Sequence, residues 1–152
     1  MIRACPTCGT KNRIPPEHLH QTGNCGKCKA VLAPIDVPIE VDATAFDAIT
    51  RGAKVPVLVD FWAAWCGPCR IAELEVKQLA TQMAGRAVVL KVDTEAHPEL
   101  AARFLIRAIP NFLIFKGGSL VMQHPGLAEH PTMKGWLEQA EKQQPVPPQA
   151  TT

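Results

Sequence analysis

The sequence predicts an α/β fold: a central mixed β-sheet flanked by helices, with a small cysteine-rich module in front. A near-continuous apolar run at residues 55–62 is typical of a strand buried on both faces, as in a parallel sheet covered by helices. Helical periodicity and a second apolar strand follow this run, which indicates a β-α-β unit. Two closely spaced cysteine pairs precede it within the first 30 residues.

Composition bounds the protein class before any motif is considered. The 152 residues are 20% charged with a formal net charge of +2, which favours a soluble protein and no polyanionic partner. No run approaches the ~18 apolar residues of a membrane span. Because Cys5 begins the first cysteine pair and leaves no room for a leader before it, we expect no cleaved leader and a cytoplasmic location. We also expect a monomer.

The first four cysteines form two Cys-x-x-Cys pairs, Cys5 with Cys8 and Cys25 with Cys28, separated by residues 9–24. This spacing matches a four-thiolate zinc site, so we expect one structural Zn²⁺ per chain. The alternative is two disulfides or four free thiols, and disulfides would need an oxidising compartment. Four thiolates close a tetrahedral site, so no histidine ligand is expected.

Proline and large apolar residues set the expected boundaries. Residues 1–33 hold few large apolar side chains, so metal binding should supply their folding free energy. The prolines at 34–38 indicate a short stiff linker, and the proline-rich segment 143–152 indicates a disordered tail. Residues 39–142 form the second predicted domain.

The elements of this second domain follow from alternating periodicities. Asp42 can cap a helix carrying Phe46 and Ile49, and Gly85 can end the helix that follows the apolar strand. In chain order we expect a strand at 39–41, a helix after Asp42, a strand at 55–62, a helix at 68–83, a strand at 88–93, a short helix at 98–104, a hairpin with strands 112–115 and 120–122, and a helix at 132–142.

The third pair, Cys66 and Cys69, stands alone at the predicted strand-to-helix junction. Two thiols at this spacing make a redox centre, because a disulfide closes there with little movement. Cys66 lies at a helix N-terminus, where the macrodipole favours a thiolate, so Cys66 is the expected nucleophile. Cys69, one turn further in and less exposed, would resolve the mixed disulfide. Gly67-Pro68 between them stiffens the first turn.

Several motifs together resemble thioredoxin. They are Val-Asp-Phe-Trp-Ala-Ala-Trp-Cys-Gly-Pro-Cys at 59–69, Ile109-Pro110, Phe-Lys-Gly-Gly at 115–118, and Gly126. The resemblance covers residues 37–142, and the four-cysteine ribbon in front is similar to the zinc-bearing bacterial thioredoxin 2 type.

The resemblance implies a thioredoxin fold with an N-terminal zinc ribbon and a protein-disulfide reductase that acts by dithiol–disulfide exchange. It also implies electrons from NADPH through thioredoxin reductase, with no bound organic cofactor. The clients would be oxidised proteins such as reductases and peroxidases. The Gly67-Pro68 dipeptide goes with the reducing members of the family.

Asp60 is a carboxylate within the apolar strand and shares a face with Leu58 and Trp62. If Asp60 is buried under the following helix, its pKa rises and it can accept the Cys69 proton. The resemblance assigns it this general-base role, with Lys91 as a possible charged neighbour. The alternative is an aspartate at a strand edge in contact with water.

The resemblance also implies a cis Ile109-Pro110 bond packed against the active cysteines. A client strand could then bond to the backbone of Ile109. Trp65, Ile109, Pro110 and Gly126, beside Pro68, would form an apolar client-binding rim. Trp62 is expected to be a core tryptophan and Trp65 to be exposed.

Three positions depart from the family pattern. Leu74 replaces a proline that kinks the active-site helix, Asn111 replaces a threonine, and Arg70 replaces a frequent lysine. We expect these residues to tune the reaction without changing its class.

Two other functions remain open at this point. One is a redox-regulated holdase whose module unfolds when oxidation ejects zinc. The other is a zinc-ribbon binding module on a thioredoxin scaffold. Nucleic acid is not expected as its partner, because the module has few aromatic residues to stack on bases.

Overall fold

Five strands form the main sheet in the computed structural model, which describes residues 1–143. Their order across the sheet is β5-β7-β6-β8-β9. The strands are β5 (Ile39–Glu40), β6 (Val57–Trp62), β7 (Val88–Asp93), β8 (Asn111–Lys116) and β9 (Ser119–Pro125). The strands β5, β7 and β6 run parallel to one another, whereas β8 is antiparallel to β6 and β9 is antiparallel to β8. The predicted mixed sheet is therefore confirmed.

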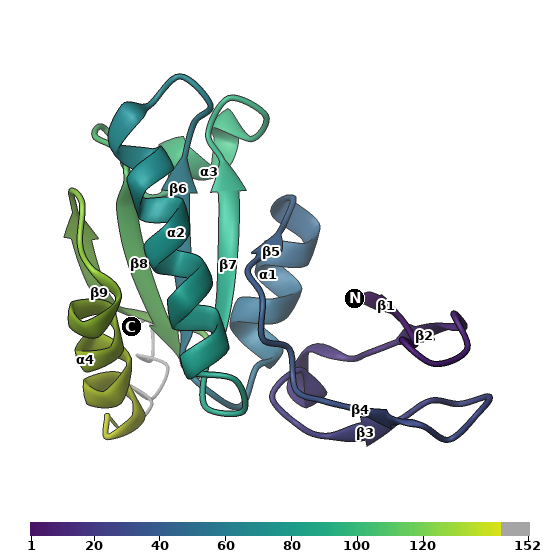
Figure 1. Ribbon diagram of the computed structural model, residues 1–152. Helices are drawn as coiled ribbons and strands as arrows, with labels where there is room; N and C mark the ends of the chain where they lie inside the picture. The colour runs from purple at the N-terminus through teal and green to yellow at the C-terminus, as the bar shows by residue number, and fades with distance from the viewer. Residues whose placement is uncertain (144–152) are drawn as a thin grey trace, which may run out of the picture.

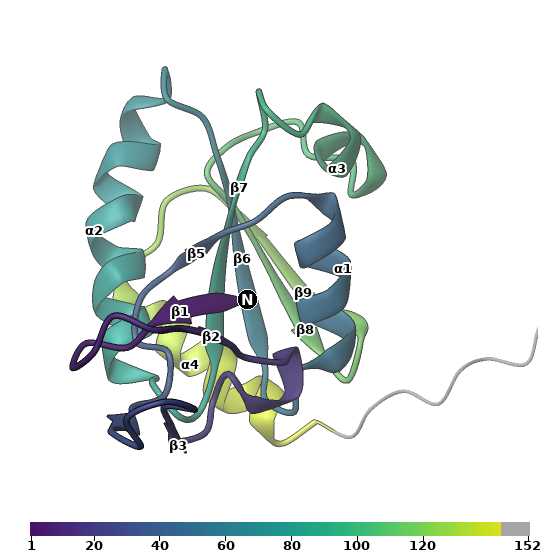
Figure 2. The same ribbon diagram turned by 90° about the vertical axis from the view of Figure 1, so that its right-hand side faces the viewer.

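Four helices cover the two faces of this sheet (Figures 1 and 2). The helices are α1 (Ala43–Gly52), α2 (Gly67–Gln82), α3 (Pro98–Arg103) and α4 (His130–Glu141). Buried side chains of α1 and α3 share one apolar cluster with the sheet, and those of α2 and α4 share the other. The fold is therefore a three-layer α/β/α arrangement, with β6 at the centre of its sheet.

The alternation of side chains along β6 places Asp60 on a defined face. Val57, Val59 and Phe61 point into the cluster that α1 and α3 cover. Leu58 points into the cluster under α2. Since successive strand residues point to opposite faces, Asp60 also lies on the α2 side, as predicted.

The helix ends follow local chemistry. The Asp42 side chain accepts a hydrogen bond from the backbone N–H of Ala45 at 2.8 Å and so caps α1. Gly85 has a φ of 85°, the left-handed conformation that glycine adopts at low cost just after a helix. Within α2 the buried residues include Ala72 and Val76. Ile71 and Leu74 contribute to the helical pattern but are 56% and 64% exposed.

The N-terminal module consists of two small antiparallel hairpins. The first pairs β1 (Ile2–Ala4) with β2 (Lys11–Arg13), and the second pairs β3 (Gly23–Asn24) with β4 (Val31–Leu32). A short 3₁₀ helix, Pro16–His18, joins the hairpins. Each hairpin carries one cysteine pair in its turn.

The module lies beside α1 and the β5 edge of the sheet, away from the start of α2 (Figures 1 and 2). Leu19 and Ile35 are buried in the apolar cluster under α1, and the Ile35 N–H donates to the Leu19 carbonyl at 3.0 Å. A Cβ on Gly52 would lie 2.9 Å from Cβ of Pro16, so the two segments approach at a distance only glycine permits. The predicted linker at 34–38 thus contains a core side chain.

The predicted tail at 143–152 lies, beyond Gln143, outside the described residues. Among residues 1–143, no helix has the length and apolar character needed to cross a membrane.

We predict that Leu19→Ala destabilises the whole fold and not only the module. Its side chain is 1% exposed within the main core, so the cavity should lower the free energy of unfolding by about 2–5 kcal/mol. Urea unfolding of the main sheet measures this change. Val31→Ala in the same module removes a side chain that is 65% exposed and should change stability by less than about 0.5 kcal/mol. An unchanged main transition in Leu19→Ala would contradict this view of the interface.

Candidate active site and metal centre

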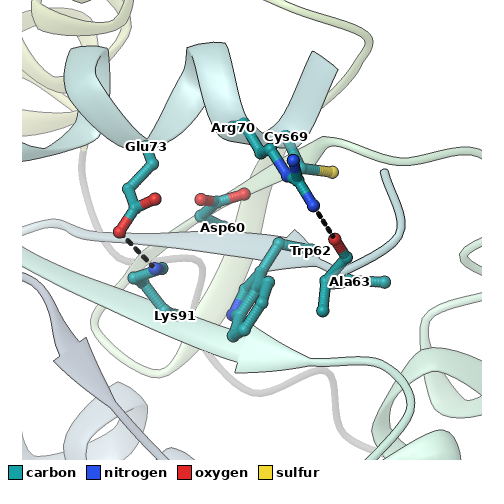
Figure 3. Close-up of a pocket in the computed structure, with 8 residues that line it drawn as sticks. Asp60, Trp62, Ala63, Cys69, Arg70, Glu73 and Lys91 are labelled. Carbon is teal, nitrogen blue, oxygen red and sulfur yellow. Dashed lines mark hydrogen bonds and ion pairs between the residues drawn. The ribbon is translucent and has the colours of Figure 1, made fainter. Parts of the chain in front are cut away.

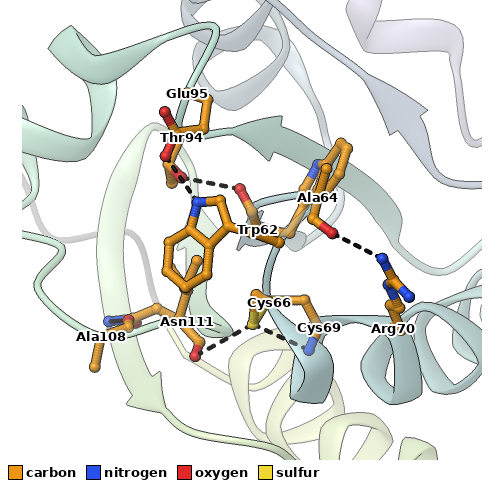
Figure 4. The surroundings of a disulfide bond; sticks show 11 residues. Trp62, Ala64, Cys66, Cys69, Arg70, Thr94, Glu95, Ala108 and Asn111 are labelled. Carbon is orange, nitrogen blue, oxygen red and sulfur yellow. Dashed lines mark hydrogen bonds between the residues drawn. A yellow bond between two sulfur atoms is a disulfide. The ribbon is translucent and has the colours of Figure 1, made fainter.

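Cys66 and Cys69 form a disulfide at the first turn of α2 (Figure 4). Cys66 is the N-cap residue of α2, and its sulfur accepts the backbone N–H of Cys69 at 3.2 Å. Their Cα atoms are 5.2 Å apart, within the usual range for a disulfide. Each cysteine is 4% exposed, so the expected difference in exposure is not present in this disulfide form. The pair is a redox centre at a helix N-terminus, as its spacing predicts.

The segment around Ile109 and Pro110 lies directly against this centre. The Ile109-Pro110 peptide bond is cis, as the resemblance implies. The Ile109 carbonyl oxygen lies 3.7 Å from the Cys66 sulfur, and the Gly126 N–H donates to the Pro110 carbonyl at 2.8 Å. Three segments distant in sequence therefore meet beside Cys66.

Exposure of the neighbouring residues leaves one side of the disulfide open to a partner. Trp65 is 69% exposed, and its indole Nε1 donates to Glu95 at 2.8 Å, which orients the ring without burying it. Gly67, Pro68 and Gly126 are also exposed. Of the other predicted rim residues, Ile109 is half-buried and Pro110 is buried, so the open part of the rim consists of Trp65, Pro68 and Gly126.

Asp60 is buried on the other side of the disulfide, beneath α2. It is 1% exposed, and neither carboxylate oxygen has a hydrogen-bond partner among the described residues. Asp60 and Cys69 line the same cavity of about 240 Å³ (Figure 3). Burial raises the pKa of Asp60 to about 7, although the charge of Lys91 acts in the opposite direction. Asp60 therefore changes its protonation near neutral pH, beside the second cysteine.

The remaining cavity residues include three charged side chains, Arg70, Glu73 and Lys91. The Lys91 ammonium lies 3.9 Å from a Glu73 carboxylate oxygen and 4.6 Å from the ring centre of Trp62. Trp62 is only half-buried, and its Nε1 donates to Glu40 at 3.0 Å. The expectation of a core tryptophan is wrong here, because this ring provides a surface for the lysine and its N–H needs a polar partner.

The three departures from the family pattern have distinct surroundings. Leu74 points outward from α2, which runs without interruption from Gly67 to Gln82. Arg70 donates to the Ala64 carbonyl at 3.3 Å. Asn111 is buried, and its amide nitrogen donates to the Ala108 carbonyl at 3.4 Å.

Two residues of this region were not identified from the sequence. Glu95 is identified only by the hydrogen bond that it accepts from Trp65, and no sequence pattern predicts this bond. Glu73 had a detectable signal: it lies four residues after Cys69, and residues four apart share one face of a helix.

The four N-terminal sulfurs converge as a second, separate cluster. All four lie within 4.8 Å of one another. Cys5 and Cys28 approach to 3.6 Å, and Cys8 and Cys25 approach to 3.7 Å, across the two pairs. A tetrahedron with Zn–S bonds of about 2.3 Å has sulfur–sulfur edges of about 3.8 Å. The cysteines are free of disulfides and fit a zinc ion.

Backbone turns of the same shape present both pairs. The N–H of Gly9 donates to the Cys5 carbonyl, and the N–H of Lys29 donates to the Cys25 carbonyl. Gly9 and Lys29 adopt left-handed φ angles of 75° and 64°. Backbone N–H groups of Thr7 and Lys27 donate to the first sulfur of each pair at 3.4 Å. Such donors stabilise thiolates, which supports the metal assignment.

Comparisons with known proteins agree with both centres. The family described as Thioredoxin matches residues 37–139, and the family described as Thioredoxin 2, N-terminal matches residues 4–30. Thioredoxin C-3 of Corynebacterium nephridii is 38% identical over 144 residues, 95% of this chain and 98% of that protein.

Two further similarities extend this result. The bifunctional thioredoxin reductase/thioredoxin of Mycobacterium leprae is 38% identical over 90 residues, 59% of this chain and 20% of that protein. A solved mutant thioredoxin from Halobacterium salinarum NRC-1 superposes with a TM-score of 0.68 at 33% identity, covering 75% of this chain and 99% of that one. The chain therefore belongs to the thioredoxin family and is a thiol–disulfide oxidoreductase that reduces disulfides in other proteins.

Proposed function

We propose that Cys66 is the attacking nucleophile, Cys69 the resolving thiol and Asp60 the general base of this reductase. The observation that carries the assignment is the Cys66–Cys69 disulfide at the N-terminus of α2, with Asp60 and Cys69 in one cavity behind it. The helix N-terminus favours a thiolate at Cys66, and Gly67-Pro68 holds the turn.

The exchange proceeds in two balanced steps. The Cys66 thiolate attacks one sulfur of a client disulfide, which forms a mixed disulfide and releases the first client thiolate. Cys69 then gives its proton to the Asp60 carboxylate, and its thiolate attacks the Cys66 sulfur. A disulfide forms between Cys66 and Cys69, and the second client thiolate leaves. The client gains two electrons, and its thiolates take protons from water.

We also propose the rim of Trp65, Ile109, Pro110 and Gly126 as the client-binding surface. An extended client segment can pair with the backbone of Ile109, which places a client sulfur beside the sulfur of Cys66. This contact uses backbone groups, so it suits clients of varied sequence.

The electron donor that we propose is a flavoprotein thioredoxin reductase using NADPH. The Mycobacterium leprae relative supports this partner, because its name joins a thioredoxin reductase to a thioredoxin in one chain. A four-thiolate zinc site requires reduced cysteines, which supports a reducing, cytoplasmic location.

For the N-terminal module we propose one structural zinc ion per chain, held by Cys5, Cys8, Cys25 and Cys28. Bound zinc would supply the folding free energy of residues 1–33, whose own apolar cluster is small. We propose that residues 34–38 join this module to a thioredoxin domain at 39–142. The burial of Leu19 and Ile35 in the main core favours a structural module over an independent binding module.

Cys69→Ser should trap clients as mixed disulfides, because Cys66 still attacks but nothing resolves the product. Cys66→Ser should form no such adducts, and both variants should lose the NADPH-driven reduction of insulin disulfides by at least ~10³-fold. Non-reducing electrophoresis and an NADPH assay with thioredoxin reductase measure the two results. Adducts that form in Cys66→Ser, and not in Cys69→Ser, would reverse the assignment.

Asp60→Asn should stabilise the oxidised protein at alkaline pH. Because burial raises the pKa of Asp60 to about 7, the native state retains a proton that the unfolded chain releases above about pH 4. The free energy of unfolding of the wild type therefore decreases as pH rises from about 4 to 7, whereas that of Asp60→Asn does not show this decrease. Its advantage should be near zero at pH 3 and reach at most ~4 kcal/mol at pH 8.

Urea unfolding at a series of pH values measures this difference. Asp36→Asn is the matched control, since Asp36 is exposed and its substitution should give no such pH-dependent gain. An Asp60→Asn advantage that is the same at every pH would contradict a buried, titrating carboxyl.

Cys8→Ser should lower the zinc content from one ion per chain to well below one and should loosen the module. The thioredoxin activity should change far less, because the hairpins β1–β2 and β3–β4, which carry these cysteines, lie apart from the start of α2 (Figures 1 and 2). Zinc stoichiometry and the insulin reduction rate, measured on the same samples, test this expectation. A point variant is preferable to removal of residues 1–33, which would also remove Leu19 from the main core. Full zinc retention in Cys8→Ser would contradict four-thiolate coordination.

A further inference from the structure

The Lys91 ammonium pairs with a different residue from the one that lies opposite Lys91 in the sheet. Lys91 on β7 lies directly opposite Asp60 on β6 in the strand register. A lysine at this place is well situated to pair with a buried carboxylate. Its ammonium instead contacts Glu73 at 3.9 Å and the Trp62 ring at 4.6 Å, and both Asp60 oxygens have no partner among the described residues.

We propose that Glu73 is a positioning residue that holds the Lys91 ammonium away from the Asp60 carboxylate. Glu73 projects from α2 over the same cavity as Asp60 and Cys69 (Figure 3). Its side chain is 46% exposed whereas that of Lys91 is 16% exposed, so the ion pair lies toward the solvent side of the cavity. By pairing with Lys91, Glu73 holds the Lys91 ammonium on the solvent side of the cavity and away from Asp60.

The other charged side chains around the cavity form hydrogen bonds or ion pairs with residues other than Asp60. Arg70 on α2 donates to the Ala64 carbonyl, and Glu40 on β5 accepts the indole N–H of Trp62. Lys77, one turn after Glu73, lies 3.7 Å from the same Glu73 oxygen and is 61% exposed. Lys77 does not line the cavity that holds Asp60. Lys91 is therefore the cation that acts on the Asp60 carboxyl, against the effect of burial.

The consequence for the reaction concerns the strength of the base. A lysine paired with Asp60 would stabilise its carboxylate and lower its pKa, which weakens it as an acceptor of the Cys69 proton. Glu73 acts in the opposite direction twice, by holding Lys91 and by placing its own negative charge near the cavity. Burial raises the pKa of Asp60 to about 7, and the negative charges of Glu40 and Glu73 act in the same direction, against that of Lys91. A pKa near neutral pH suits proton transfer from Cys69.

The test is the titration of the Asp60 carboxyl, followed by ¹³C NMR in the oxidised protein, where Cys66 and Cys69 carry no proton. Glu73→Gln should lower the Asp60 midpoint by about half to one pH unit, and Lys91→Met should raise it. In the Lys91→Met background, Glu73→Gln should produce a clearly smaller shift. Glu73→Asp, which keeps the charge, should restore part of the wild-type midpoint.

Glu138→Gln is the matched control. Glu138 is also 46% exposed and paired with an arginine, Arg86, but lies on α4. Its substitution should leave the Asp60 midpoint unchanged. An unchanged or raised midpoint in Glu73→Gln would overturn the proposal, and so would equal shifts with and without Lys91. A shift of the same size in Glu138→Gln would also overturn it.

This inference rests on the proposed role of Asp60 as the base, and kinetics separates the two. The acid limb of the pH profile for client reduction should move to lower pH in Glu73→Gln, in parallel with the NMR midpoint. The limb should disappear in Asp60→Asn. If Asp60→Asn leaves the profile intact, the base assignment fails, whereas the NMR shift still decides the role of Glu73.

Discussion

The packing of α2 on the sheet is the contact on which both the fold and the chemistry depend. Its buried side chains, which include Ala72, Val76 and Leu79, share one apolar cluster with Leu58 of β6 and Val89 of β7. This contact places Cys66 at the helix N-terminus and encloses Asp60. The other end of α2 meets the linker at 34–38, where Thr81 Oγ1 donates to the Asp36 carbonyl at 3.3 Å. One helix therefore connects the redox centre with the segment that follows the N-terminal module.

The burial of Asp60 makes reactivity and stability oppose each other. A carboxyl without hydrogen-bond partners among the described residues is costly when charged, and the cost appears as a raised pKa. An apolar side chain at this position would pack against α2 at no such cost. In the role that we propose for Asp60, a proton acceptor is maintained at the expense of folding free energy, as is common for residues that act in a reaction. Burial causes most of this cost, and in our proposal the Lys91–Glu73 pair modifies it.

Patterns local in sequence predicted most of the fold and the position of the redox centre. The apolar run of β6 predicted a buried strand, and the spacing of the cysteine pairs predicted the redox centre and the metal cluster, because each pattern depends only on residues close in sequence. The burial of Leu19 and Ile35 in the main core was not predictable, since it depends on how the module docks. The prediction that Trp62 lies in the core was wrong for a related reason: its half-buried ring contacts Lys91, which belongs to another strand. Glu73 becomes meaningful only once α2 lies over Asp60.

The two kinds of Cys-x-x-Cys pair show how backbone conformation decides the chemistry of identical spacing. At Cys66 the chain enters a helix, so both sulfurs of one pair face each other, with the buried carboxyl of Asp60 behind them. At Cys5 and Cys25 the chain turns back into a hairpin through a left-handed residue, Gly9 or Lys29. Sulfurs of different pairs there approach to 3.6 and 3.7 Å, which is the separation that a shared metal ion requires and a disulfide does not. A thiol pair in a helix turn is thus suited to disulfide exchange, whereas two pairs in facing hairpin turns are suited to hold a metal ion.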